Sequence, residues 1–159
     1  MRAWMILPVA LWMAAGCEPG GLYENTRQFA SGTVTARERW RAAGPAFDAP
    51  GKAVDGRSAT AAVTGSDYAN ADLTIDLGEV CLFNTVVIDH GTAGQMGFPR
   101  RVAVLTSDDG ERFERQTTSP GTRRVTVIPL IRPTLARYVR FRALVPGGRP
   151  WSVAEVHLQ

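Results

Sequence analysis

The chain has 159 residues, and its 18 basic and 15 acidic side chains give a formal net charge of +3 at pH 7. This length suits one domain whose core is large enough to be stable without a disulfide framework. The positive charge comes from 17 arginines and one lysine, and many of the arginines alternate with apolar residues in the C-terminal half. Such alternation favours strands with a solvated outer face over a surface for nucleic acid.

The N-terminus has the pattern of an export signal. A positive start is followed by an uncharged apolar run over residues 3–15 and by small residues that end at Gly16. This run is shorter than the roughly 18 to 20 residues of a membrane span. Small residues directly before Cys17 resemble the lipobox of bacterial lipoproteins, in which the cysteine is acylated and becomes the first residue. We therefore expect residues 1–16 to be removed and Cys17 to carry a lipid anchor, with a plain secretory signal as the alternative.

The segment after the cysteine indicates where the protein resides. Glu18, rather than aspartate, follows Cys17, which by analogy with lipoproteins of bacteria with two membranes indicates the outer membrane or the cell surface; the periplasm is the alternative. Residues 17–28 are rich in glycine, proline and polar side chains, so we expect a short tether. Cys81 begins an apolar segment and is expected to be a buried, inert thiol. If Cys17 is not lipidated, a disulfide between the two cysteines is the alternative.

From residue 29 to the C-terminus, short segments of strand character are separated by turn residues. The expected strands cover residues 29–35, 73–77, 82–89, 101–106, 112–116, 124–130, 137–145 and 151–158. Alternation with a period of two is clearest over Tyr138–Arg142, and Asp109-Gly110 between two strands is a hairpin signal. Residues 36–43 form a helical turn or a loop. Many short strands without a sustained helical period predict an all-β fold, an antiparallel β-sandwich over residues 29–159.

Five short motifs occur in an order that resembles a known family. They are Ala53-Val54-Asp55-Gly56 with Thr60, Leu73-Thr74-Ile75-Asp76-Leu77-Gly78, Thr106-Ser107-Asp108-Asp109-Gly110 with Phe113, Ala136-Arg137-Tyr138-Val139-Arg140-Phe141, and Ala154-Glu155-Val156. The family is the discoidin-like domains, also known as the coagulation factor five/eight type C domains and carbohydrate-binding module family thirty-two. The resemblance implies an eight-stranded jelly roll with variable ligand-binding loops at one end.

The first of these motifs has the residues of a loop that binds a hard cation. Asp55 offers a carboxylate, Thr60 offers a hydroxyl group, and Gly56 allows a sharp turn. Glu155, nearly a hundred residues later, could complete an oxygen cage for Ca²⁺. In the family that the chain resembles, the matching positions that hold a structural Ca²⁺ are Lys52, Asp55, Arg57, Thr60, Ala154 and Glu155. The alternative is an ordinary Asp-Gly turn and a solvated glutamate.

A second group of residues could contact a sugar. The loop over residues 90–99 contains a histidine, an amide and an aromatic side chain, which are the groups that stack on sugars and bind their hydroxyls. In sugar-binding relatives such residues come from neighbouring loops, so the candidates are His90, Phe98, Tyr68, Arg149 and Trp151. The alternative is that Trp151 and Phe98 belong to the core, that His90 caps a strand, and that Tyr68 and Arg149 are plain surface residues.

No motif of a catalytic site is found. The two histidines lack the cysteine or carboxylate neighbours of a zinc site, and Asp108 and Asp109 are explained by a hairpin turn. We therefore expect a non-catalytic carbohydrate-binding domain whose partner is a glycan or polysaccharide, that reaches the membrane through its anchor only, and that binds no nucleic acid. One alternative is an adhesion lipoprotein that binds protein or anionic membrane through an arginine-rich face. Another is a fragment that once accompanied a hydrolase.

Overall fold

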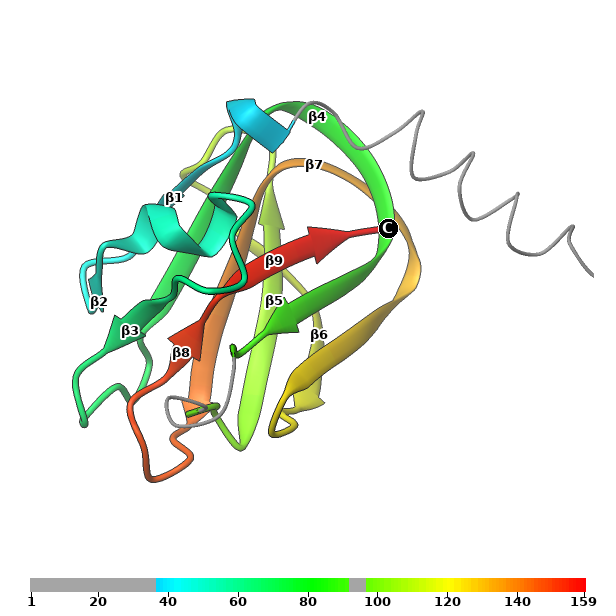
Figure 1. Ribbon diagram of the computed structural model, residues 1–159. Helices are drawn as coiled ribbons and strands as arrows, with labels where there is room; N and C mark the ends of the chain where they lie inside the picture. The colour runs from blue at the N-terminus through cyan, green and yellow to red at the C-terminus, as the bar shows by residue number, and fades with distance from the viewer. Residues whose placement is uncertain (1–36, 92–96) are drawn as a thin grey trace, which may run out of the picture.

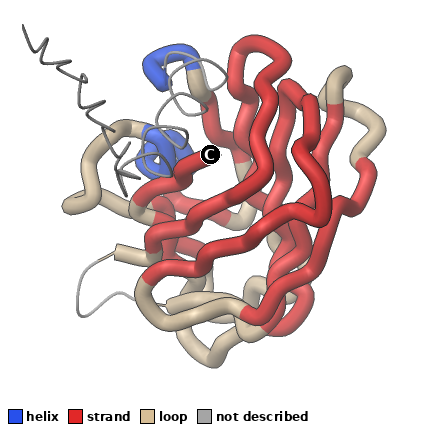
Figure 2. The backbone as a smooth tube through the Cα atoms, turned by 90° about the vertical axis from the view of Figure 1, so that its right-hand side faces the viewer, coloured by secondary structure: helices blue, strands red, loops and turns tan. Residues whose placement is uncertain are grey.

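A computed structural model, which describes residues 37–91 and 97–159, consists of antiparallel strands and two short 3-10 helices (Figure 1). One sheet has the order β1 (Arg41–Ala43), β4 (Asp72–Asp89), β7 (Val125–Val145), β5 (Arg101–Ser107) and β6 (Glu114–Pro120), and β9 (Glu155–Leu158) also pairs with β4. The other sheet has the order β2 (Phe47–Asp48), β3 (Ala62–Thr64) and β8 (Ser152–Val153). The helices are η1 (Arg37–Arg39) and η2 (Pro50–Val54). Figure 2 shows that strands make up most of the fold and that both helical turns lie toward one side.

The larger sheet folds over, so that its two long strands, β4 and β7, run through both layers of the sandwich (Figure 1). The first half of β4 pairs with β1 and with the end of β7, whereas its second half pairs with β9 and with the start of β7. The register shifts between Asp76 and Cys81 and again between Phe83 and Thr85. Such irregularities bend a strand, and Gly78, with a φ of 81°, lies in the first of them. Both strands therefore arch from one layer to the other (Figure 1).

The predicted antiparallel jelly-roll sandwich is confirmed, but its strands are divided differently: the expected strand over residues 151–158 is β8 and β9, and β1 lies in the segment expected to be a helical turn or a loop. The expected segments 73–77 and 82–89 are the two halves of β4, and 124–130 and 137–145 are the two halves of β7. The sequence shows turn residues at both arches, but bulges keep each strand continuous there. The expected strand over residues 29–35 lies outside the described residues.

The core lies between the layers and follows the expected alternation. On β4, Leu73, Ile75 and Leu77 have no exposed surface, while the residues between them are partly exposed. On the neighbouring β7, Val139 and Phe141 are also fully buried. Burying a side chain of this size contributes about 1.5–3 kcal/mol relative to leaving it in water. The alternating strands therefore account for a large part of the stability of the sandwich.

The expected signal peptide, the lipidated Cys17 and the tether also lie outside the described residues. Within the described part of the chain, no helix is both long enough and apolar enough to cross a membrane. Cys81 lies on β4 and is 1% exposed, so the prediction that its thiol is buried is confirmed.

Candidate functional site

The loop that follows η2 is closed by the side chain of Asp55. Its Oδ1 accepts a hydrogen bond from the backbone amide of Arg57 at 2.9 Å, and its Oδ2 accepts one from the hydroxyl of Thr60 at 2.7 Å. The Thr60 hydroxyl also lies 3.0 Å from the carbonyl oxygen of Arg57. Gly56 has a φ of 78°, a backbone conformation that residues with a Cβ rarely adopt. The turn therefore depends on both the aspartate and the glycine.

Glu155, the first residue of β9, joins this loop from the other end of the chain. It is 3% exposed, and its Oε1 accepts hydrogen bonds from the backbone amides of Gly56 at 2.6 Å and of Arg57 at 3.2 Å. Its Oε2 accepts a hydrogen bond from the guanidinium of Arg37. Because the amide of Arg57 also binds Asp55, one donor links the two carboxylates. The structure thus brings Asp55 and Glu155 to one place.

The oxygen atoms gathered at this loop match the chemistry of Ca²⁺, which prefers carboxylate, hydroxyl and carbonyl oxygens as ligands. Within the described residues, no group of three or more His, Cys, Asp or Glu side chains could hold a metal, so an ion here would need Thr60 and backbone carbonyls besides the two carboxylates. Each oxygen of Asp55 and Glu155 already accepts a hydrogen bond from the chain. An ion would therefore compete with these donors, above all with the charged Arg37.

The other predicted cation ligands lie close by but face other partners. The amide of Lys52 donates to the carbonyl of Ala49 at 3.0 Å, and its side chain is exposed. Ala154 is fully buried, and its amide donates to the carbonyl of Asp89 at 2.8 Å. Because these bonds use the amides, an ion would bind Lys52 and Ala154 through their carbonyl oxygens. The Ca²⁺ site stays a prediction.

The five residues predicted to contact a sugar divide into three that are buried and two that are accessible. His90 and Trp151 have no exposed surface and Tyr68 is 2% exposed, whereas Phe98 is half-buried and Arg149 is exposed. A side chain without exposed surface cannot serve as a platform for a sugar ring. Direct sugar contact by the three buried residues is therefore not supported, and their packing shows a different role.

His90 is held by hydrogen bonds at both ring nitrogens. Its Nδ1 lies 2.8 Å from the carbonyl oxygen of Ser152, and its Nε2 lies 2.8 Å from the hydroxyl of Thr126. A carbonyl only accepts, so Nδ1 carries the proton and Nε2 accepts from the threonine. Burial lowers the pKa of His90, which keeps the ring neutral. The ring also packs against Phe98, with centroids 5.9 Å apart. His90 thus positions the loop that carries Phe98.

Tyr68 and Trp151 are buried beneath the same end of the sandwich and pack against its loops. The hydroxyl of Tyr68 accepts a hydrogen bond from the amide of Gly147 at 2.6 Å and donates one to the carbonyl of Phe98 at 3.2 Å. Burial raises the pKa of Tyr68, so this hydroxyl keeps its proton. Trp151 packs edge-on against Phe47, with centroids 5.1 Å apart, and lies 6.3 Å from the ring of Tyr68. These side chains join the loop over residues 97–99 to the loop over residues 146–150.

Two glycines that sequence reasoning did not single out let these loops approach closely. A Cβ on Gly97 would lie 1.6 Å from the carbonyl oxygen of Pro150, and one on Gly147 would lie 1.9 Å from the carbonyl oxygen of Phe98. Only glycine fits at such distances. We call the surface formed by residues 97–100 and 146–150 the loop rim; it carries Phe98 and Arg149. The residues between 92 and 96, which belong to the predicted ligand loop, lie outside the described part.

Three arginines in the second half of β7, Arg137, Arg140 and Arg142, are paired with residues of β4. Arg142 binds both carboxylate oxygens of Asp72, at 2.7 and 2.6 Å, and Arg137 binds both oxygens of Asp76, at 2.9 and 3.0 Å. The hydrogen bond from Arg137 is the main reason that the pKa of Asp76 lies below its ordinary value. Bidentate pairs of this kind cancel much of the local positive charge. This face is therefore less cationic than its arginine content suggests.

The comparison with protein families gives one match over most of the chain. The family model described as "F5/8 type C domain" matches residues 33–156. No curated protein sequence is a significant match to the chain.

Solved structures share the fold at low sequence identity. A family 32 carbohydrate-binding module of NanJ from Clostridium perfringens, in complex with galactose, has a TM-score of 0.71 at 19% identity and covers 79% of this chain and 97% of its own. Another module from Clostridium perfringens, in complex with GalNAc-β-1,3-galactose, has a TM-score of 0.70 at 18% identity, with coverage of 77% and 96%. A chitosan-binding module of a Paenibacillus chitosanase/glucanase, in complex with chitotriose, has a TM-score of 0.67 at 18% identity, with coverage of 76% and 95%.

Proposed function

Because the chain belongs to the F5/8 type C domain family, we propose that its domain binds carbohydrate and does so without catalysing a reaction. The observation that carries this proposal is the loop rim, where Phe98 and Arg149 lie on two loops joined by hydrogen bonds of the Tyr68 hydroxyl and by close glycine contacts. An aromatic ring can stack on the C–H face of a sugar, and a guanidinium can donate to its hydroxyls. Support comes from similar structures that hold galactose, GalNAc-β-1,3-galactose and chitotriose.

The test is a glycan array probed with the full-length protein and its variants. Phe98→Ala and Arg149→Ala are expected to weaken binding to the preferred glycan by roughly tenfold or more, the effect of losing one stacked ring or one charge-assisted hydrogen bond. Phe113→Ala and Arg115→Ala are the matched controls, since both residues lie outside the rim, and they should leave binding unchanged. An array without selective signal at high protein concentration would contradict the proposal.

For the loop around Asp55, the proposal is a structural Ca²⁺ ion that joins the start and the end of the domain. Asp55, Thr60 and Glu155 would supply side-chain oxygens, and Lys52, Arg57 and Ala154 would supply carbonyls. The support is the convergence of Asp55 and Glu155 on the amide of Arg57. Such an ion would hold the loop in place and take no part in binding the sugar.

The proposed location is the outer membrane or the cell surface, through a lipid on Cys17. The support is the sequence alone, in which small residues precede the cysteine and a tether follows it. Metabolic labelling with a fatty acid tests this proposal, because a Cys17→Ser variant should lose the label. The second candidate, an adhesion protein with an arginine-rich face, receives little support from β7, because Asp76 and Asp72 pair with Arg137 and Arg142 of its outer face.

A further inference from the structure

A hollow of about 560 Å³ lies far from the loop rim, beneath the arch of β7. Its walls are the end of β5, the hairpin that leads to β6, the start of β6, and residues 132–135 of β7. β5 connects the two places, because Arg101 at its start lies next to the rim and Ser107 at its end lines the hollow. A strand of this length spans roughly 20 Å. The hollow is therefore separate from the site proposed above, and its size suits a small ligand.

The hairpin forms a fixed wall of this hollow. Oδ1 of Asp109 accepts hydrogen bonds from the hydroxyl of Ser107 and from the amides of Glu111 and Arg112, at 2.8 to 2.9 Å. These bonds to amides lower the pKa of Asp109 to about 2, so the carboxylate is charged at neutral pH. Gly110 completes the turn with a φ of 78°. Asp109 is thus occupied in holding the turn.

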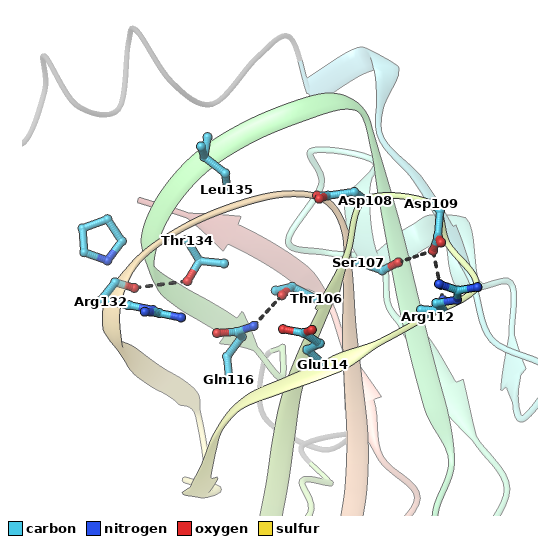
Figure 3. Close-up of a pocket in the computed structure, with 11 residues that line it drawn as sticks. Thr106, Ser107, Asp108, Asp109, Arg112, Glu114, Gln116, Arg132, Thr134 and Leu135 are labelled. Atoms are coloured by element: carbon cyan, nitrogen blue, oxygen red, sulfur yellow. Dashed lines mark hydrogen bonds between the residues drawn. The ribbon is translucent and has the colours of Figure 1, made fainter.

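Other polar side chains of the hollow remain available to a ligand. Figure 3 shows Arg132, Thr134, Gln116 and Thr106 around one space beneath the arch, with Glu114 beside them. Gln116 donates to the hydroxyl of Thr106 at 2.8 Å, which leaves its amide oxygen free to accept. Among the described residues, no side-chain hydrogen bond or ion pair involves the carboxylate of Glu114 or the guanidinium of Arg132. Both charged groups can therefore turn toward a bound molecule.

The mixture of donors and acceptors indicates the class of ligand. Arg132 only donates and Glu114 only accepts, so a simple anion would meet Glu114 and a simple cation would meet Arg132. A sugar hydroxyl both donates and accepts, so neighbouring hydroxyls of one ring satisfy both groups. Pro133 and Leu135 line the edge, and Leu135 is 63% exposed, which provides an apolar surface for C–H groups.

We propose that this hollow is a second saccharide site, which binds an uncharged sugar through Glu114, Gln116 and Arg132. The inference rests on the proposed function of the domain. Two sites at opposite ends of β5 would let one molecule hold two glycan chains, or two parts of one chain. The affinity of the protein for a polysaccharide would then exceed the affinity of either site alone.

Backbone amide chemical shifts of the full-length protein, titrated separately with galactose, GalNAc-β-1,3-galactose and chitotriose, test the inference. At least one of these sugars should shift the amides of Thr106, Gln116 and Thr134 in a saturable manner. Arg132→Ala and Glu114→Gln should each weaken this response by roughly tenfold, the loss expected for a charge-assisted hydrogen bond. Arg115→Ala, on the opposite face of β6, is the matched control and should leave the response unchanged.

The outcomes separate this inference from the proposed function. Saturable shifts only at Phe98, Arg100 and Gly147 would overturn the second site and support the rim. Shifts only at the hollow would support the second site and overturn the rim. If the saturable shifts at the hollow weaken equally in Arg132→Ala and Arg115→Ala, the assignment of the binding residues would be overturned. An absence of shifts with all three sugars would overturn both proposals.

Discussion

Arg37 and Glu155, which are 118 residues apart in the sequence, form an ion pair at the start of the last strand. The Glu155 side chain is 4% exposed, and the same Arg37 guanidinium donates to the carbonyl of Val156 at 2.9 Å and lies 3.2 Å from Nδ1 of His157. A buried carboxylate is costly without a nearby positive charge. Arg37 of η1 therefore places a positive charge beside Glu155, where the family resemblance predicts Ca²⁺.

Removing this arginine is expected to destabilise the domain. Among the described residues, Arg37→Ala leaves Glu155 with only the amides of Gly56 and Arg57 as donors, and we expect a loss of about 1–3 kcal/mol of unfolding free energy in the absence of calcium. The expected loss of unfolding free energy is smaller than for a fully buried pair because the Arg37 side chain is 37% exposed. Denaturant unfolding measures the loss. Arg39→Ala, whose ion pair with Glu79 is exposed and 3.8 Å long, should change stability by less than about 0.5 kcal/mol.

Calcium is expected to stabilise the Arg37→Ala variant more than the wild type. Without Arg37, a divalent ion meets no competing cation at Glu155, so its contribution to stability increases. Thermal unfolding of both proteins, with millimolar Ca²⁺ and with a chelator, measures this difference. Equal shifts in melting temperature would mean that Arg37 and the ion do not compete. No shift in either protein would contradict the proposed ion.

Stability is expected to fall as the pH falls below about 6.5, the ordinary pKa of histidine. Burial lowers the pKa of His90 in the folded state, although the Ser152 carbonyl and Asp89 oppose this effect. The unfolded chain therefore binds more protons than the folded chain in this range, so protonation favours unfolding. The pKa of His157 is lowered as well, by burial and by Arg37.

Unfolding midpoints between pH 5 and pH 8 measure this dependence. His90→Gln should be less stable than the wild type at pH 8 and should show a shallower dependence on pH, because one titrating group is lost. A His90→Gln variant with the same dependence as the wild type would contradict the role given to His90. His157→Gln measures the share of the second histidine.

A methyl group at Gly97 is expected to disrupt the loop rim. Gly97→Ala would place a Cβ against the Pro150 carbonyl, so the two loops must separate, and sugar binding should weaken together with stability. Gly51→Ala is the matched control, since no atom lies within 4 Å of its added Cβ. Thermal unfolding and glycan binding are measured for both variants. Full binding and stability in Gly97→Ala would contradict the close contact of the loops.

The alternation of apolar residues predicted the sandwich, because burial with a period of two depends on local sequence. The same pattern did not show that β4 continues through its arch, since bulges after Asp76 depend on pairing with the distant β7. Residue type suggested His90 and Trp151 as sugar ligands, but both are fully buried. Aromatic and histidine side chains suit a core as well as a binding surface, and only the packing of the complete chain separates these roles.

The partners of charged residues were equally hard to predict. Asp55 and Glu155 were expected at one site on the basis of the family resemblance, and both accept a hydrogen bond from the amide of Arg57. The contact between Glu155 and Arg37 has no local signal, because η1 and β9 meet only in the folded chain. Gly97 was missed for the same reason, since its neighbour Pro150 is far away in the sequence.

The most direct test of the central claim is an equilibrium titration of the preferred glycan against the wild type, Arg149→Ala and Arg142→Ala at low and high salt. Carbohydrate binding at the loop rim predicts that Arg149→Ala loses roughly tenfold or more in affinity. Arg142→Ala, on the outer face of β7, should retain the affinity of the wild type, and salt should have little effect. A loss confined to Arg142→Ala, together with a steep decrease with salt, would contradict the account and would place recognition on the arginine face.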